Sequence, residues 1–393
     1  MFQPQPMLLR LCSLALFRGL LGKPPLTELR RFCSASSLEE KVEAYASFAA
    51  AVYTAGGNLT SALRTAILEE ENVYMLARAQ KKPVPENWNR ALAAELAILE
   101  EVSQLTPEQL QSGMDYSGYL PEWETEPAAL APLYEERMAE IPRYGYGIYA
   151  RHHAFLLKEG KLEPVLHPDE IRLDALSGYE RERAQVIRNT AALLQSKPAA
   201  NILLYGDAGT GKSATVKAVA NAFHSEGLRL IELKKNQLHH IPTLMDSLSR
   251  NPLKFILFID DLSFSRDDDN FSALKAVLEG SVSAKTRNLA IYATSNRRHL
   301  VKECFSDRQG DELHASDTLQ ELVSLSDRFG LTVTFTRPAK QEYLRIAAAL
   351  ALQQGLKLPA VELSARADQF ALHRGGYSPR TAKQFVESLL SQS

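Results

Sequence analysis

One segment near the middle of the chain reads Gly206-Asp207-Ala208-Gly209-Thr210-Gly211-Lys212-Ser213. It fits the pattern GxxxxGK followed by Ser or Thr, and it directly follows the apolar run 201–205. A glycine-rich turn between a buried strand and a helix can direct several backbone N–H groups at one phosphate chain, with the positive end of the helix behind them. The segment therefore predicts a nucleotide-binding phosphate loop, in which Lys212 reaches the outer phosphates and the Ser213 hydroxyl holds Mg²⁺.

The residues after this loop are predicted to form a helix. Its apolar residues recur at the spacing of one helical face: Val216, Val219, Ala220 and Phe223. Ala214, in the first turn of that helix, completes the predicted set of nucleotide-binding residues. The alternative is a glycine turn with only a structural role, but the strand before it and the helix after it favour nucleotide binding.

Length and composition indicate an ordinary globular protein. A chain of 393 residues is long for one domain and predicts two or three. The net charge of -2 argues against an overall electrostatic role in binding nucleic acid or membranes, although it leaves room for a local basic patch. Cys12, Cys33 and Cys304 are far apart and lack CxxC spacing, so they suggest neither a disulfide framework nor a zinc site. A reducing cytoplasm is the simplest compartment.

The first thirty residues are largely apolar and contain no acid before Glu28, but Arg10 and Arg18 interrupt them. This pattern fits neither a transmembrane helix nor a secretory signal, so we predict no transmembrane segment. An organelle transit peptide, a membrane-surface helix and the first helix of a domain all remain compatible with it, and we favour the last.

Residues 1–165 are predicted to form a mostly helical N-terminal domain that ends in a linker. Ser37 and Glu40 have the spacing of a helix capping box, and no phosphate loop, metal cluster or nucleophile motif occurs in this region. The tyrosine-rich run 143–149 could stack on single-stranded nucleic acid, or it could form a turn or a short strand that packs between domains, and we favour a turn or strand. The domain is therefore a candidate for recognising a partner whose identity it does not indicate.

The pattern changes after this region to strands that alternate with helices. The strand-like runs are 201–205, 228–233, 255–259, 288–294 and 331–335. Such alternation predicts an α/β fold with a parallel five-stranded sheet and helices on both faces. Only helical patterns follow Pro338. We therefore predict a nucleotide-binding core over residues 166–338 and a helical lid over residues 339–393.

Two acids, Asp260 and Asp261, end the apolar run 255–259. Ligands of open α/β sheets bind at the carboxyl ends of the strands. Asp260 is therefore placed to bind Mg²⁺, and Asp261 to orient or deprotonate an attacking water. The alternative is two solvated acids, but the upstream phosphate loop favours the functional interpretation. The acids at 267–269 more simply form a solvated loop and the start of a helix.

Two other polar residues are weaker candidates. Asn296 follows the strand-like run 288–294 and could hold the attacking water or touch the γ-phosphate, although asparagine after a strand is an ordinary turn residue. Arg328 could equally form an ion pair at a helix end. The residue types alone decide neither case.

The order of these segments resembles the AAA+ ATPase superfamily. Besides the phosphate loop, the resemblance rests on Leu176-Ser177-Gly178-Tyr179-Glu180, Ile259-Asp260-Asp261, Ala293-Thr294-Ser295-Asn296, Ser326-Asp327-Arg328-Phe329 and Ser378-Pro379-Arg380. More narrowly, residues 165–390 resemble the uncharacterised bacterial family catalogued as domain of unknown function 815.

The resemblance implies an ATP site shared between the subunits of a homo-oligomer. By similarity, Leu176 to Gly178 would line the adenine pocket, and Asn296 would be the first sensor of the γ-phosphate. Arg328 would be an arginine finger that reaches the next subunit, and Arg380 would be the second sensor on the lid.

The local sequence supports the assignment of Arg380 to the lid. Two residues, Pro379 and Asp261, depart from the pattern of the superfamily. Ser378 can cap a helix that has Pro379 at its first position, which fixes Arg380 in the first turn. Pro379, however, replaces the small residue often found there. Asp261 stands where the superfamily usually has glutamate, and its shorter side chain implies slower water activation.

We therefore predict an ATPase that binds ATP and Mg²⁺ and hydrolyses ATP to remodel or switch an unidentified protein client. The alternative is a nucleotide-dependent loader or regulator of nucleic-acid machinery with slow hydrolysis, for which Arg297, Arg298 and His299 are weak support. A small-molecule kinase would need an acceptor pocket and an arginine-rich lid inserted within the core, which the sequence does not indicate.

Overall fold

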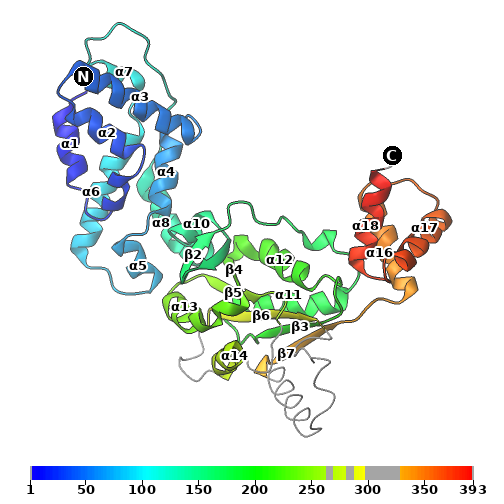
Figure 1. Ribbon diagram of the computed structural model, residues 1–393. Helices are drawn as coiled ribbons and strands as arrows, with labels where there is room; N and C mark the ends of the chain where they lie inside the picture. Colours follow the sequence, from blue (N-terminus) through cyan, green and yellow to red (C-terminus); the bar gives the residue numbers. More distant parts are fainter. Residues whose placement is uncertain (1, 263–268, 280–286, 297–327, 392–393) are drawn as a thin grey trace. The chain divides into compact units, whose positions relative to one another are not determined.

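The computed structural model describes residues 2–262, 269–279, 287–296 and 328–391 (Figure 1). The chain divides into two compact units, Met1–Arg151 and His152–Ser393. The predicted boundary at residue 165 falls within the second of these units, because residues 154–164, interpreted from the sequence as a linker, form two strands of its sheet.

The described residues of the first unit form helices joined by loops, with one isolated β-bridge between Asn58 and Glu124. Its helices are α1 (Pro4–Cys12), α2 (Leu26–Ser34), α3 (Leu38–Thr54), α4 (Leu59–Glu69), α5 (Val73–Ala79), α6 (Glu86–Ser103), α7 (Pro107–Gln111), α8 (Leu130–Ala139), α9 (Ile141–Tyr144) and α10 (Ile148–Arg151). The predicted capping box forms at the start of α3, where Ser37 and Glu40 each accept a backbone N–H of the other residue. The tyrosine-rich run forms α9, a turn at Gly145 and the start of α10, and Tyr146 is buried.

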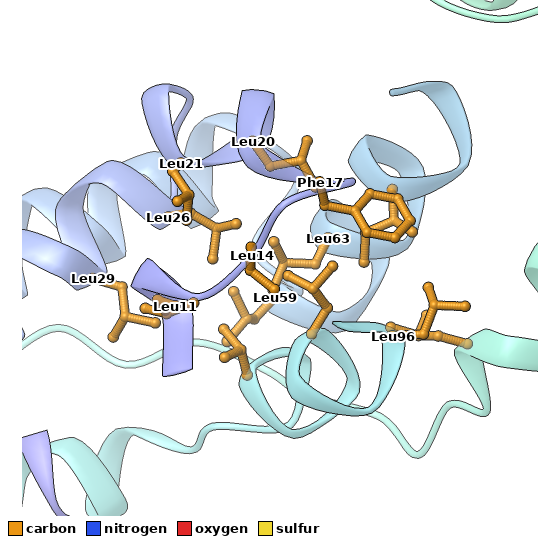
Figure 2. Close-up of a cluster of buried hydrophobic side chains, with 14 of the residues drawn as sticks. Leu11, Leu14, Phe17, Leu20, Leu21, Leu26, Leu29, Leu59, Leu63 and Leu96 are labelled. Atoms are coloured by element: carbon orange, nitrogen blue, oxygen red, sulfur yellow. The ribbon is translucent and has the colours of Figure 1, made fainter. Parts of the chain in front are cut away.

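The apolar start of the chain belongs to the core of this unit. Figure 2 shows Leu11, Leu14 and Phe17 close to side chains of α4 and α6. Each of these three residues is at most 1% exposed. The apolar pattern of the first thirty residues is therefore explained by packing within the unit.

A single carboxylate organises the turn between α1 and α2. Glu95 of α6 is 5% exposed, and its oxygens accept the backbone N–H groups of Ala15, Leu16 and Phe17 at 2.9–3.1 Å. Three backbone donors that no helix satisfies thus find a buried charged acceptor. An unpaired buried donor costs about 1–3 kcal/mol.

The Glu95→Ala variant is expected to lower the free energy of unfolding by about 3 kcal/mol or more, because it leaves these three donors without their acceptor. Urea denaturation of the full chain followed by circular dichroism measures the change. The matched control is Glu43→Ala, whose side chain is 68% exposed and should change stability by no more than about 0.5 kcal/mol. Equal effects of the two variants would contradict the role given to Glu95.

Within its described residues, the second unit is built on a mixed sheet of seven strands (Figure 1). Its strands are β1 (Ala154–Lys158), β2 (Lys161–Pro164), β3 (Ile202–Gly206), β4 (Leu228–Leu233), β5 (Lys254–Ile259), β6 (Leu289–Asn296) and β7 (Leu331–Phe335). They lie in the order β2-β1-β4-β5-β6-β3-β7, and all neighbours are parallel except β1 and β2.

The predicted five strands are present, but the count of five was wrong. Two additional strands, β1 and β2, form a hairpin whose turn residues Glu159 and Gly160 both have positive φ, at 49° and 76°. Paired positive φ values suit a two-residue hairpin turn. Glu-Gly is a weak turn signal and β2 is only half apolar, so this segment resembled a linker. The hairpin extends the sheet because β1 pairs with β4.

Helices and a lid complete the second unit. Its described helices are α11 (Glu180–Leu194), α12 (Lys212–Phe223), α13 (Ile241–Leu248), α14 (Asp269–Glu279), α16 (Lys340–Gln353), α17 (Ala360–His373) and α18 (Pro379–Leu390). One face of the sheet buries Val186 of α11 and Val216 and Val219 of α12. The central strands are buried along almost their full length, as a parallel sheet covered by helices requires. The last three helices have their own apolar cluster.

Candidate phosphate-binding site

Strand order brings the predicted site residues together. In the sheet, β6 lies between β3 and β5, with Asn296 opposite Gly206 and Ala293 opposite Ile259. The strands are parallel, so their carboxyl ends meet at one edge. The phosphate loop, the acid pair and Asn296 therefore converge there, although up to 90 residues separate them along the chain.

Two positions of the loop require glycine, each for a different structural reason. Gly206 ends β3 with φ at 143°, and a Cβ there would lie 2.0 Å from the carbonyl oxygen of Phe335. Gly211 has φ at 91° and precedes the first residue of α12. A side chain at either position would strain the loop.

The other loop residues complete the turn into the helix. Thr210 is buried, and its hydroxyl donates to the Asp207 carbonyl oxygen at 2.8 Å. Ala208 is exposed at the tip, and Ala214 lies in the first turn of α12. The helix therefore begins at the loop, as the sequence predicted.

Lys212 is folded over the loop. Its ammonium donates to the carbonyl oxygens of Gly206 at 3.0 Å and Asp207 at 2.7 Å, and to Oδ1 of Asn296 at 3.1 Å. The side chain is 6% exposed, and this burial lowers the pKa of Lys212, while nearby carboxylates oppose the shift. A partly desolvated cation held at the loop is a strong attractor for phosphate oxygens, because charges interact more strongly away from water.

Ser213 and Asp260 offer a fitting pair of magnesium ligands. The Ser213 hydroxyl donates to Oδ1 of Asp260 at 2.6 Å, across the gap between the start of α12 and the end of β5. Mg²⁺ prefers oxygen ligands and binds through few protein groups, with water and phosphate completing its shell. The two residues therefore match the donor set that the ion needs.

Asp261 has a strained backbone and a tethered side chain. Its φ is 51°, in the left-handed region, which costs a residue with a side chain roughly 1 kcal/mol. Nδ2 of Asn296 donates to Oδ1 of Asp261 at 2.7 Å. Asn296 thus bridges Lys212 and Asp261, which places the predicted sensor amide between the predicted phosphate ligand and the predicted base.

The lid is bonded directly to the phosphate loop. The Arg380 backbone N–H donates to the Gly209 carbonyl oxygen at 3.1 Å, and the Arg337 backbone N–H donates to Oδ2 of Asp207 at 3.0 Å. Ser378 caps α18 by accepting the Thr381 N–H at 3.1 Å, as the sequence predicted. Arg380 therefore lies in the first turn of α18, beside the loop.

The segment predicted to hold adenine packs between the lid and the core. Gly178 has φ at 78°, and a Cβ there would lie 2.7 Å from Cδ1 of Ile346 in α16. Tyr179 donates its hydroxyl to the Thr336 carbonyl oxygen at 2.6 Å, and its ring lies 5.2 Å from that of Phe335. Leu176 is half-buried. The role of Leu176 and Gly178 in binding a base stays a prediction.

Arg328 lies at the other edge of the sheet. Leu331, which begins β7, is opposite Ile202, whereas Phe335 is opposite Gly206. Leu331 therefore lies about 13 Å along the strand from the residue opposite Gly206, at ~3.3 Å per residue, and Arg328 comes three residues before Leu331. The structure thus does not bring Arg328 to the loop of its own chain.

Several residues considered from the sequence lie outside the described residues, among them Asp267, Asp268, Arg297, Arg298 and His299.

The clearest missed residue is Thr294, whose hydroxyl donates to Oδ1 of Asp260 at 2.5 Å. The sequence feature that could have identified Thr294 is a hydroxyl-bearing residue directly after the apolar run 290–293. No local sequence pattern predicts the bond between Asp207 and Arg337, because it joins segments that are distant in sequence.

A parallel run of strands, a glycine loop between β3 and α12, an acid pair after β5 and a C-terminal helical lid form the arrangement that the resemblance to the AAA+ superfamily predicted. Residues 150–393 match the model of the family described as "Protein of unknown function (DUF815)". The match covers more than half of the chain, and the chain belongs to this family.

Solved structures of RuvB from Thermotoga maritima are similar to part of this chain, with low sequence identity and low TM-scores. One is described as a Holliday junction branch migration motor, with a TM-score of 0.39, 16% identity, and coverage of 56% of this chain and 64% of that chain. Two point variants of RuvB have TM-scores of 0.38 and 16% identity, and each covers 56% of this chain and 64–65% of its own. The chain thus spans about 64% of the length of these structures.

No curated protein matches the chain. Among the described residues, no helix has the length and apolar character needed to cross a membrane.

The Gly206→Ala variant is expected to lower the free energy of unfolding of the second unit by about 2 kcal/mol or more, because its Cβ would overlap the Phe335 backbone. Gly355→Ala is the matched control, since Gly355 also has positive φ but has open space around it, so only about 1 kcal/mol is expected. Urea unfolding measures both. A loss at Gly206 no larger than that at Gly355 would contradict the close approach of β3 and β7.

Proposed function

We propose that this protein is an ATPase that binds ATP with Mg²⁺ at residues 206–214 and uses hydrolysis to remodel or switch a partner protein. One observation carries the proposal. Lys212, Ser213, Asp260, Asp261 and Asn296 form one hydrogen-bonded cluster at the carboxyl edge of the sheet. A purely structural glycine turn would not require a buried lysine, two acids and an amide around it.

Each member of the cluster has a distinct task in this proposal. The loop N–H groups and Lys212 bind the phosphates and neutralise the charge that develops during transfer. Ser213 and Asp260 would hold Mg²⁺, which supplies additional positive charge at the phosphate oxygens. Asn296 orients the attacking water, and Asp261 accepts its proton.

The lid and a neighbouring subunit supply the remaining positive charge. Arg380 extends from a helix whose first turn is bonded to the phosphate loop, which supports its role in binding phosphate oxygens. Arg328 precedes β7, whose first residue lies about 13 Å along the strand from the residue opposite the start of the loop. That position supports a role at the loop of a neighbouring copy, in a homo-oligomer with shared sites. Arginine suits both tasks because its planar guanidinium bridges two phosphate oxygens.

A slow nucleotide switch is the second candidate, favoured by the geometry of Asp261. Its carboxylate is one methylene shorter than glutamate, and it is held by Asn296 on a strained backbone. Slow proton removal would extend the lifetime of the ATP-bound form. A loader or regulator of nucleic-acid machinery would use such a lifetime to hold its partner. We propose that the first unit recognises the partner, because it contains no part of the candidate site.

The Lys212→Ala variant is expected to lower ATP turnover by at least about 100-fold, because it removes a main charge on the transferred phosphate. A phosphate-release assay without any acceptor molecule measures turnover and separates hydrolysis from kinase activity. Lys217→Ala, on the same helix, is the control and should leave turnover unchanged. Turnover that persists in Lys212→Ala would overturn the assignment of the site.

The Arg328→Ala variant is expected to lose at least about 100-fold in turnover if a neighbour receives this arginine. Mixing it with Lys212→Ala should restore part of the activity, because a mixed oligomer contains interfaces with both an intact loop and an intact arginine. The control mixture uses Arg366→Ala, which forms a surface ion pair with Glu362 and should be active by itself. Absence of any restoration in a confirmed mixed oligomer would rule out the shared site.

A further inference from the structure

Thr294 is a polar residue in a position that otherwise suits an apolar one. It lies in β6 after four buried residues, Ala290 to Ala293, and is itself 2% exposed. A buried hydroxyl costs free energy unless it is hydrogen-bonded. The partners of this hydroxyl therefore indicate why threonine occupies the position.

The hydroxyl contacts both acids of the candidate site. Its Oγ1 donates to Oδ1 of Asp260 at 2.5 Å and accepts the backbone N–H of Asp261 at 2.9 Å. The Thr294 carbonyl oxygen also accepts the Leu262 N–H at 2.7 Å. One residue of β6 thus holds three successive residues at the end of β5.

These bonds determine how Asp260 presents its carboxylate. Oδ1 accepts from Thr294, from the Ser213 hydroxyl at 2.6 Å and from the Asp261 N–H at 3.1 Å. Three donors on one oxygen restrict rotation of the carboxylate. The restricted group is the proposed magnesium ligand, and partners behind a metal ligand commonly set its orientation.

The same hydroxyl supports the backbone of Asp261. That residue has φ at 51°, and its N–H is shared between Thr294 and Asp260. Asn296, two residues further along β6, holds the side chain of Asp261 at 2.7 Å. The end of β6 therefore holds Asp261 twice, with Thr294 bonded to its backbone and Asn296 to its side chain.

We propose that Thr294 is a positioning residue that orients Asp260 toward Mg²⁺ and holds Asp261 in its left-handed conformation for water activation. The inference rests on the proposed ATPase function and assigns a task that the phosphate loop and the acid pair do not include. Thr294 itself would touch neither nucleotide nor metal.

The test compares two variants that separate the hydroxyl from the methyl group. Thr294→Val keeps the shape and removes the hydroxyl, whereas Thr294→Ser keeps the hydroxyl and removes the methyl group. The control is Thr334→Val, an exposed threonine of β7 whose hydroxyl lies outside the site. The dissociation constant of ATP is measured on the full chain by titration calorimetry, with Mg²⁺ and with a chelator, and turnover is measured separately.

The readout specific to this proposal is the gain in ATP affinity that Mg²⁺ produces. In Thr294→Val we expect that gain to fall by about 10-fold and turnover to fall by about 10–100-fold, with affinity in chelator unchanged. Thr294→Ser and Thr334→Val should keep both properties within about 3-fold of the unmodified chain. A threonine with only a structural role would lower stability without a selective loss of the magnesium-dependent gain.

Two results would overturn the inference. A full magnesium-dependent gain and full turnover in folded Thr294→Val would show that the hydroxyl positions neither acid. A serine variant as defective as the valine variant would assign the effect to the methyl group. Should Thr294→Val fail to fold, Thr294→Ala compared with Thr294→Ser isolates the same hydroxyl. If the unmodified chain binds no ATP under either condition, the proposed function itself is wrong.

Discussion

The parallel pairing of β6 with β3 on one side and β5 on the other is the constraint on which the rest of the candidate site depends. It places Asn296 opposite the first residue of the phosphate loop and Ala293 opposite the last residue before the acid pair. A shift of two residues along β6 would move Asn296 away from Lys212 by roughly 7 Å, at ~3.3 Å per residue. The hydrogen bonds between Lys212 and Asn296 and between Thr294 and Asp260 are made in this register.

The cluster at the strand ends gives several buried polar groups their partners. Lys212 is bonded to two carbonyl oxygens and one amide oxygen, and Thr294 is bonded to Asp260 and Asp261. Such a network costs little only when its members are all satisfied. The same bonds connect the loop to β5 and β6, so a ligand that pulls on Lys212 would also act on Asn296. The lid joins this network through the N–H of Arg380.

The sequence was most informative where the backbone needs a special residue or where an apolar run is interrupted. Gly206, Gly211 and the acids after β5 follow that rule, and all were predicted as site residues. The α/β class was also predicted and is confirmed by the sheet and its helices, and the predicted family is confirmed by the match over residues 150–393. The hairpin of β1 and β2 was missed, because the four residues of β2, two exposed and two half-buried, have little apolar character. Contacts between distant segments, such as that of Asp207 with Arg337, depend on tertiary packing and leave no local pattern.

A structure of the full chain with a non-hydrolysable ATP analogue and Mn²⁺ in place of Mg²⁺ tests the central claim most directly, because anomalous scattering locates the ion independently of the model. The account predicts phosphate density within hydrogen-bonding distance of the loop N–H groups and Lys212. It also predicts an anomalous peak beside Oγ of Ser213 and the Asp260 carboxylate. An ion or a nucleotide bound elsewhere in the chain, with this edge of the sheet unliganded at saturating analogue, would contradict it.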